Sequence, residues 1–173
     1  MLKVEIHTEE IPTIFARFRD VIDESHWKKR VSLIKSEIRG NHFLRDYLIE
    51  NNYIAYAFER FSELETRYGQ IPPDEIENRK LYPAISMAAQ VLSIIERSST
   101  VQANKLVRRI HGAFKNPEDM RAFQFELRAA THFLMRGHAL IWPEMEGSGS
   151  SSVYFFPNKE SRFWHHDFEG LFL

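Results

Sequence analysis

The 173-residue sequence contains no cysteine. Without thiols the chain can form neither disulfide bridges nor thiolate metal sites, and this usage is typical of the reducing cytosol. No apolar run approaches the roughly 18–20 residues that span a bilayer, and the segment Met1 to His7 lacks the apolar stretch of a secretory signal. We therefore expect a cytoplasmic protein without a membrane partner.

The sequence also has no large excess of positive or of negative charge. The 23 Lys and Arg residues are balanced by 24 Asp and Glu residues, which gives a formal net charge of −1. Such a balance supplies no overall attraction to nucleic acid. Binding to DNA would have to come from local basic patches, and another protein is the alternative partner.

Several motifs that carry chemistry are absent from the sequence. It has no glycine-rich phosphate loop, no Gly-x-Ser-x-Gly elbow and no His-Glu-x-x-His zinc helix. Most enzyme classes are therefore left without support, and we expect no catalytic activity and no cofactor.

The sequence is rich in aromatic and apolar residues at helical spacing. Apolar residues make up 43% of the chain, including 14 Phe, 6 Tyr and 3 Trp, which is enough to fill a core. Their spacing predicts a mainly α protein: a bundle of about six helices over residues 10–136, followed by a small C-terminal β-element. We divide the chain into a helical domain, residues 1–116, and a second unit, residues 117–173, of one helix and short strands.

Individual helices are marked by apolar stripes and by residues that start or stop a helix. Trp27, Val31, Ile34 and Ile38 form one stripe, and the pair at residues 51–52 predicts a break between two helices. Between residues 42 and 68 we expect a further buried pattern of Phe43, Tyr47, Ile54, Phe58, Phe61 and Leu64. Residues 83–97 are the most apolar stretch, which predicts a central helix that begins at Pro83.

The C-terminal unit begins with a strong helix start at Asn116-Pro117. The apolar face of this helix ends at Gly137, after which His138–Trp142 and Val153–Phe156 are predicted to be short strands. The helix carries Glu126, the strand follows it, and a loop rich in Gly and Ser runs to Gly149.

This order, over residues 123–149, resembles the front of the PD-(D/E)XK, or restriction-endonuclease-like, nuclease superfamily. The resemblance implies that the C-terminal unit is a fragment of an α/β nuclease domain. It also implies that Glu126 is a catalytic residue that helps to hold Mg²⁺, which polarises the phosphate and activates water.

The sequence departs from the family pattern after residue 149. The expected aspartate does not follow the loop, and no strand with an acid and a lysine comes after it. We therefore expect an inactive nuclease relative, whose coding sequence is truncated or frame-shifted near residue 150. The alternative is a helical protein–protein interaction module without enzymatic activity; an active relative would be an Mg²⁺-dependent nuclease.

Basic and acidic clusters are the remaining candidate sites. Lys105, Arg108 and Arg109 gather on one side of their predicted helix, which makes them candidates for phosphate contacts. Lys28–Arg30 form a second basic cluster of the same kind. We interpret two other clusters as solvated rather than as metal ligands; these are Glu144 with Glu146, and His165, His166, Asp167 with Glu169.

Overall fold

The computed structural model describes residues 6–72, 75–142 and 154–156. These residues form seven α-helices, two 3-10 turns and a two-stranded antiparallel sheet. The helices are α1 (Ile11–Ile22), α2 (Ser25–Gly40), α3 (Arg45–Asn51), α4 (Tyr53–Tyr68), α5 (Glu75–Arg97), α6 (Thr100–Ala113) and α7 (Pro117–Met135). The turns are Thr8–Glu10 and His42–Leu44, and the strands are β1 (Ala139–Ile141) and β2 (Tyr154–Phe156). The predicted fold class is confirmed.

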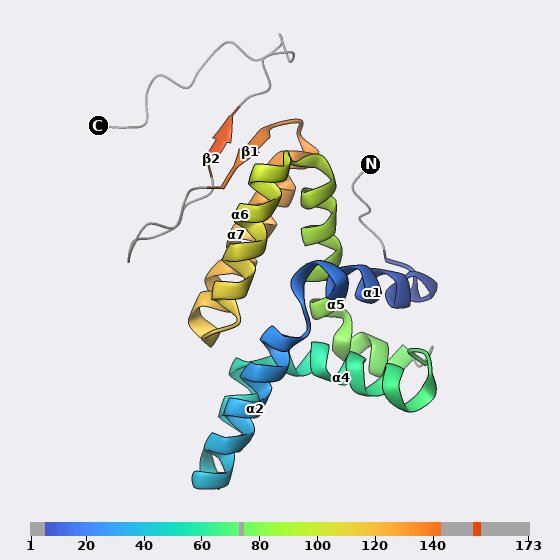
Figure 1. Cartoon of the computed structure of the whole chain (residues 1–173), viewed down its shortest axis with the longest axis vertical. Helices are drawn as coiled ribbons and strands as arrows, with labels where there is room; N and C mark the ends of the chain where they lie inside the picture. The colour runs from blue at the N-terminus through green and yellow to red at the C-terminus, as the bar shows by residue number, and fades with distance from the viewer. Residues whose placement is uncertain (1–5, 73–74, 143–153, 157–173) are drawn as a thin grey trace, which may run out of the picture.

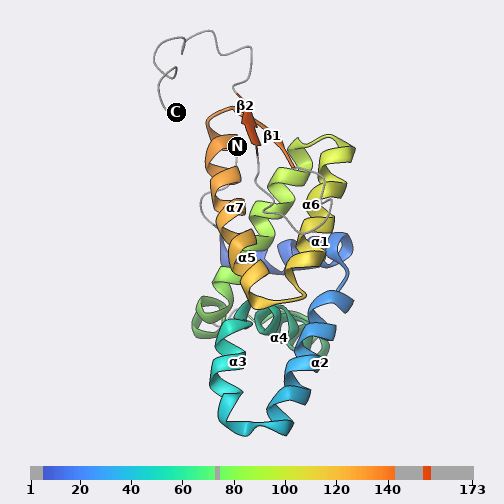
Figure 2. The same cartoon turned by 90° about the vertical axis from the view of Figure 1, so that its left-hand side faces the viewer.

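The elements are arranged along one long axis (Figures 1 and 2). At one end α2 and α3 run antiparallel and are joined by the short turn at residues 42–44, with α4 lying across their other ends. Helices α6 and α7 form an antiparallel pair beside α5 in the other half, and the sheet lies beyond them. The α2–α3 hairpin and the sheet are therefore at opposite ends of the molecule.

Helix α5 is the centre of the bundle, as the sequence predicted. It packs against α1, α4, α6 and α7, and Ile85, Ala88 and Val91 have essentially no exposed surface. The predicted start of this helix at Pro83 is wrong, because α5 begins at Glu75 and contains the proline. Leu81 and Ala84 are both buried beside it, so tertiary packing holds the helix together across a residue that cannot donate its backbone hydrogen bond.

Aromatic rings join α2 to the rest of the bundle. Trp27 has no exposed surface and lies 5.3 Å from Phe58 of α4, measured between ring centroids. It also contacts Phe15 and Phe18 of α1, and Phe114 at the end of α6. Ring pairs at these distances add to the free energy of burial itself, so this cluster fixes where α2 leaves the core.

Helix α7 and Trp142, the residue that follows β1, belong to the same continuous core as the first six helices. Phe123, Leu127 and Trp142 are buried in the cluster that contains Phe15 and Phe58. The backbone N–H of Trp142 donates to Oε1 of Gln102 at 2.7 Å. The boundary drawn at residue 116 thus lies between two helices that pack into one hydrophobic core. In the sheet β1 pairs with β2 in the register Ala139–Phe156 and Ile141–Tyr154, as expected for a C-terminal β-element.

The ends of two helices follow from residues in their immediate neighbourhood, including the predicted start at Asn116. The Asn116 side chain accepts the backbone N–H of Asp119 at 2.7 Å, and Gly69 ends α4 with φ of 71°. The expected burial of Phe43 and Tyr47 is wrong, since Phe43 is fully exposed and Tyr47 is 64% exposed. The α2–α3 turn, which carries Phe43, and the start of α3, which carries Tyr47, extend beyond the bundle, so nothing covers these two rings within the described residues.

Two histidines join the start of α2 to α6. The rings of His26 and His111 are stacked with centroids 3.7 Å apart, and Nε2 of His111 donates to the carbonyl oxygen of Ile22 at 3.0 Å. Burial, followed by the charge of His111, lowers the pKa of His26 from its usual 6.5. Lys115 and Lys29 act in the same direction as His111, and Asp23 opposes them.

This contact predicts a loss of stability in mild acid. Because the folded pKa of His26 is lower than the unfolded one, the unfolded chain binds a proton first as the pH falls below about 6.5. The free energy of unfolding should therefore decrease from about pH 7 to about pH 5 in urea titrations. His26→Phe keeps a stacked ring without a titrating group and should flatten this slope, whereas His42→Gln, in the exposed turn, should leave it unchanged. If the free energy of unfolding decreased equally steeply in the parent and in His26→Phe, His26 would not be the group responsible.

Candidate functional site

Glu126 and Arg109, both singled out in the sequence, bind each other. Nε and Nη2 of Arg109 lie 3.1 and 3.0 Å from Oε2 and Oε1 of Glu126, so the pair is bidentate. The guanidinium also lies 5.7 Å from the ring centroid of Phe123. Glu126 has no basic neighbour at helical spacing on α7, and its partner comes from α6 instead.

The ion pair is nearly enclosed by the bundle. The exposed fractions of the two side chains are 9% for Arg109 and 16% for Glu126. Because each carboxylate oxygen already accepts a charged donor, Glu126 is poorly placed to bind Mg²⁺, which needs several oxygen ligands in octahedral geometry. Among the described residues no group of three or more His, Asp or Glu side chains is placed to hold a metal ion.

The three basic residues that were predicted to contact phosphate differ in their surroundings in the structure. Arg109 turns into the core, Arg108 is exposed, and Lys105 is half-buried with an interaction of its own. Arg109 is buried because Leu106, Ile110 and Ala113 form the inner face of α6 and Arg109 lies beside them. The three cations therefore do not share one exposed side, although the sequence had predicted that they would. The acidic pair at residues 144 and 146 and the histidine cluster at 165–169 lie outside the described residues.

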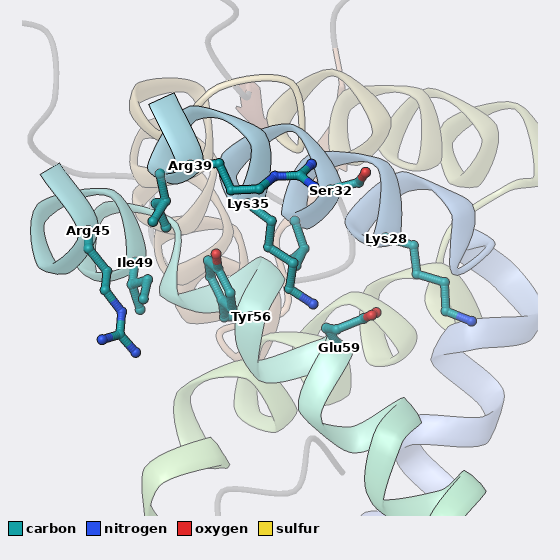
Figure 3. Close-up of a pocket in the computed structure, with 10 residues that line it drawn as sticks. Lys28, Ser32, Lys35, Arg39, Arg45, Ile49, Tyr56 and Glu59 are labelled. Atoms are coloured by element: carbon teal, nitrogen blue, oxygen red, sulfur yellow. The ribbon is translucent and has the colours of Figure 1, made fainter. Parts of the chain in front are cut away.

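A groove of about 660 Å³ lies between α2, α3 and α4, at the end of the molecule opposite the sheet. Basic side chains line it from two helices: Lys28, Lys35 and Arg39 from α2, and Arg45 from α3. Tyr56 and Glu59 line it from α4. Figure 3 shows Lys35 reaching from α2 toward the space between these two side chains.

The sequence of α2 explains why its cations share one side. Lys28, Ser32, Lys35 and Arg39 follow each other at steps of four, three and four residues, which places them on one helix face. This face borders the buried stripe of Trp27, Val31 and Ile34. Packing of that stripe against α4 therefore turns the basic face toward the groove.

The groove has an excess of positive charge. Four Lys and Arg residues and one Glu line the groove, a net charge of +3 in a chain of net charge −1. Lys28 pairs with Glu24 at 2.7 Å, but Lys35, Arg39 and Arg45 form no ion pair with any described residue. Burial raises the pKa of the Tyr56 hydroxyl, and the positive charge of Arg45 acts against that rise.

Other cations of α2 have different surroundings. Arg30, from the basic cluster at residues 28–30, donates to Oδ1 of Asn52 at 2.8 Å and to the carbonyl oxygen of Lys115 at 3.0 Å. It therefore links α2 to α4 and to the end of α6. Lys29 is exposed outside the groove, which makes it a useful control for the groove cations.

The groove wall formed by α3 is less buried than the wall formed by α2. Helix α3 has no buried residue and exposes Tyr47, and the adjoining turn exposes Phe43 and Leu44. Sequence reasoning did not identify this groove, because basic residues beside an apolar stripe are what most amphipathic helices display. The regular spacing of Lys28, Lys35 and Arg39 was the available signal, but the opposing wall depends on contacts between distant helices.

Comparison of the chain with protein-family models, curated proteins and solved structures found no match. In the described part of the chain, no helix combines the length and the apolar character needed to cross a bilayer. Function is therefore inferred from the chain's own side chains.

We predict that the buried Arg109–Glu126 ion pair stabilises the folded chain. Glu126→Ala leaves a buried guanidinium without its partner and should lower the free energy of unfolding by about 3–5 kcal/mol. Replacing both residues, as Arg109→Met with Glu126→Leu, should recover most of this loss because no buried charge remains. Urea denaturation at fixed pH measures both changes.

The exposed pair of Arg17 and Glu96 is the matched control. Both side chains are more than half exposed, so Glu96→Ala should cost less than about 1 kcal/mol. A loss for Glu126→Ala as small as that for Glu96→Ala would mean that the bidentate pair does not stabilise the bundle.

Proposed function

We propose that the chain is a helical interaction module that binds an anionic partner in the groove between α2, α3 and α4, and that it catalyses no reaction. The observation that carries this proposal is the cluster of Lys35, Arg39 and Arg45, which line one groove without ion-pair partners among the described residues. Cations without an ion-pair partner are available to a ligand.

Electrostatics favours binding at this groove over the rest of the surface. A unit charge at about 4 Å from another contributes on the order of 1 kcal/mol in water, and more where apolar walls lower the local dielectric constant. A concave wall of one charge sign also concentrates the field and raises the rate of encounter with an opposite charge. The contribution of several cations is therefore expected to exceed that of isolated surface lysines.

The proposal can be tested with two polyanions of unlike chemistry. Fluorescein-labelled poly-L-glutamate and a labelled oligodeoxythymidylate would be titrated with the chain at low and at physiological salt. We expect binding that weakens with salt, and a loss of affinity of at least about tenfold in the double variant Arg39→Glu/Arg45→Glu, corresponding to about 1.4 kcal/mol.

The control variant Lys29→Glu/Arg108→Glu changes the net charge by the same amount at exposed positions outside the groove. It should bind within about twofold of the parent, a difference below about 0.5 kcal/mol. Equal losses in both variants would mean that binding follows net charge and would remove the groove as the site. A loss confined to an Arg108→Glu single variant would instead favour DNA binding at α6.

A second candidate function is that of a PD-(D/E)XK nuclease relative without activity. The helix carrying Glu126 is followed by an antiparallel pair of strands, the order on which the resemblance rests, and this favours shared ancestry. The same helix binds Arg109 through both oxygens of Glu126, which disfavours metal binding there. Mg²⁺ would be the cofactor only of an active relative.

We expect no cleavage of supercoiled plasmid by the purified chain with Mg²⁺ or Mn²⁺, because the single candidate acid is neutralised and the family's lysine is missing. The comparison variant is Arg109→Met/Glu126→Leu, chosen so that loss of Glu126 does not also unfold the bundle. Nicking by the parent that disappears in this folded variant would overturn the expectation and make Glu126 a catalytic residue.

A further inference from the structure

The groove combines its cations with an apolar floor. Val31 and Ile38 of α2 and Ile49 of α3 line it together with the ring of Tyr56, and Val31 is buried while the other three side chains are half-buried. A ligand that carried only charged groups would leave these apolar side chains in contact with water. Covering it removes apolar surface from water, which contributes about 25 cal/mol for each Å².

Glu59 places a second constraint on the chemistry of the ligand. It is an acid among basic lining residues, and its Oε2 is enclosed without a hydrogen-bond partner in the described part of the chain. A carboxylate short of donors is costly, and an N–H group of a ligand reaches this enclosed oxygen only when a neighbouring groove side chain moves aside. A phosphodiester backbone has no such donor and would place negative charge near Glu59.

The length of the basic face limits the size of the ligand. Lys28 and Arg39 are eleven residues apart on α2, or about 16 Å at 1.5 Å per residue. That span matches about three turns of a helix or about five residues of extended chain. The groove volume of about 660 Å³ accommodates a few side chains.

We propose that the groove binds a short acidic peptide segment of a partner protein whose carboxylates alternate with apolar side chains. The carboxylates contact Lys35, Arg39 and Arg45, the apolar side chains cover Ile38, Ile49 and the ring of Tyr56, and backbone N–H groups face Glu59. This inference rests on the proposed function and specifies the partner's chemistry.

This inference can be tested by selecting peptides that bind the chain from a displayed library. A library of random 12-residue peptides would be selected on the intact chain, with counter-selection on the Arg39→Glu/Arg45→Glu variant. The expected result is enrichment of peptides with at least three Asp or Glu residues and two or more large apolar residues. Enrichment of basic or purely apolar peptides, or no enrichment over the counter-selected pool, would overturn the proposal.

Titration of one enriched peptide separates the contributions of the groove. Ile49→Ser should weaken binding of this peptide at least fivefold while leaving poly-L-glutamate binding within twofold. Ile49 is half-buried on a helix without buried residues, so the variant is expected to fold; Phe125→Ser, at an exposed site on α7, is the control. Equal weakening of peptide and poly-L-glutamate would contradict a role for the apolar floor.

The two proposals fail in different ways. If the groove variant still binds both polyanions as the parent does, the proposed function itself is wrong. If polyanion binding depends on the groove but oligodeoxythymidylate binds more tightly than any selected peptide at equal charge, only the peptide inference fails and single-stranded nucleic acid becomes the ligand.

Discussion

The packing of Trp27 is the interaction on which the rest of the structure depends. Its ring lies among aromatic side chains of α1, α4 and the end of α6, so one residue near the start of α2 joins elements from both halves of the chain. The same contact fixes the rotation of α2 about its axis. Since the basic face borders the Trp27 stripe, the direction in which Lys35 and Arg39 point is a consequence of how that ring is buried.

Features that depend on neighbouring residues could be predicted from the sequence. Asn116 caps α7 and Gly69 ends α4 because each needs only the backbone within a few positions. The central position of α5 followed from its apolar residues on several sides. Pro83 misled the prediction because the burial of its neighbours, which depends on other helices, outweighs the local preference against proline inside a helix.

The candidate sites depend on residues that are far apart in the chain, and here the sequence was less informative. Glu126 was judged on α7 alone, where it has no partner, yet Arg109 lies seventeen positions earlier on a different helix. Arg109 itself was grouped with Lys105 and Arg108 because the sequence of α6 alone does not show which of its sides packs against α7. For the groove, spacing showed that Lys28, Lys35 and Arg39 share a face, but only the tertiary structure places Arg45 and Glu59 opposite them.

The two walls of the groove differ in mechanical stiffness. Helix α2 is anchored by the fully enclosed Trp27, Val31 and Ile34, and moving it would disturb close-packed rings. Helix α3 buries no side chain, so a small displacement of this wall forfeits little packing energy. Segments held by few buried contacts open at low free energy. We therefore expect α3, rather than α2, to move when side chains of different size enter the groove, while the basic face of α2 keeps its position.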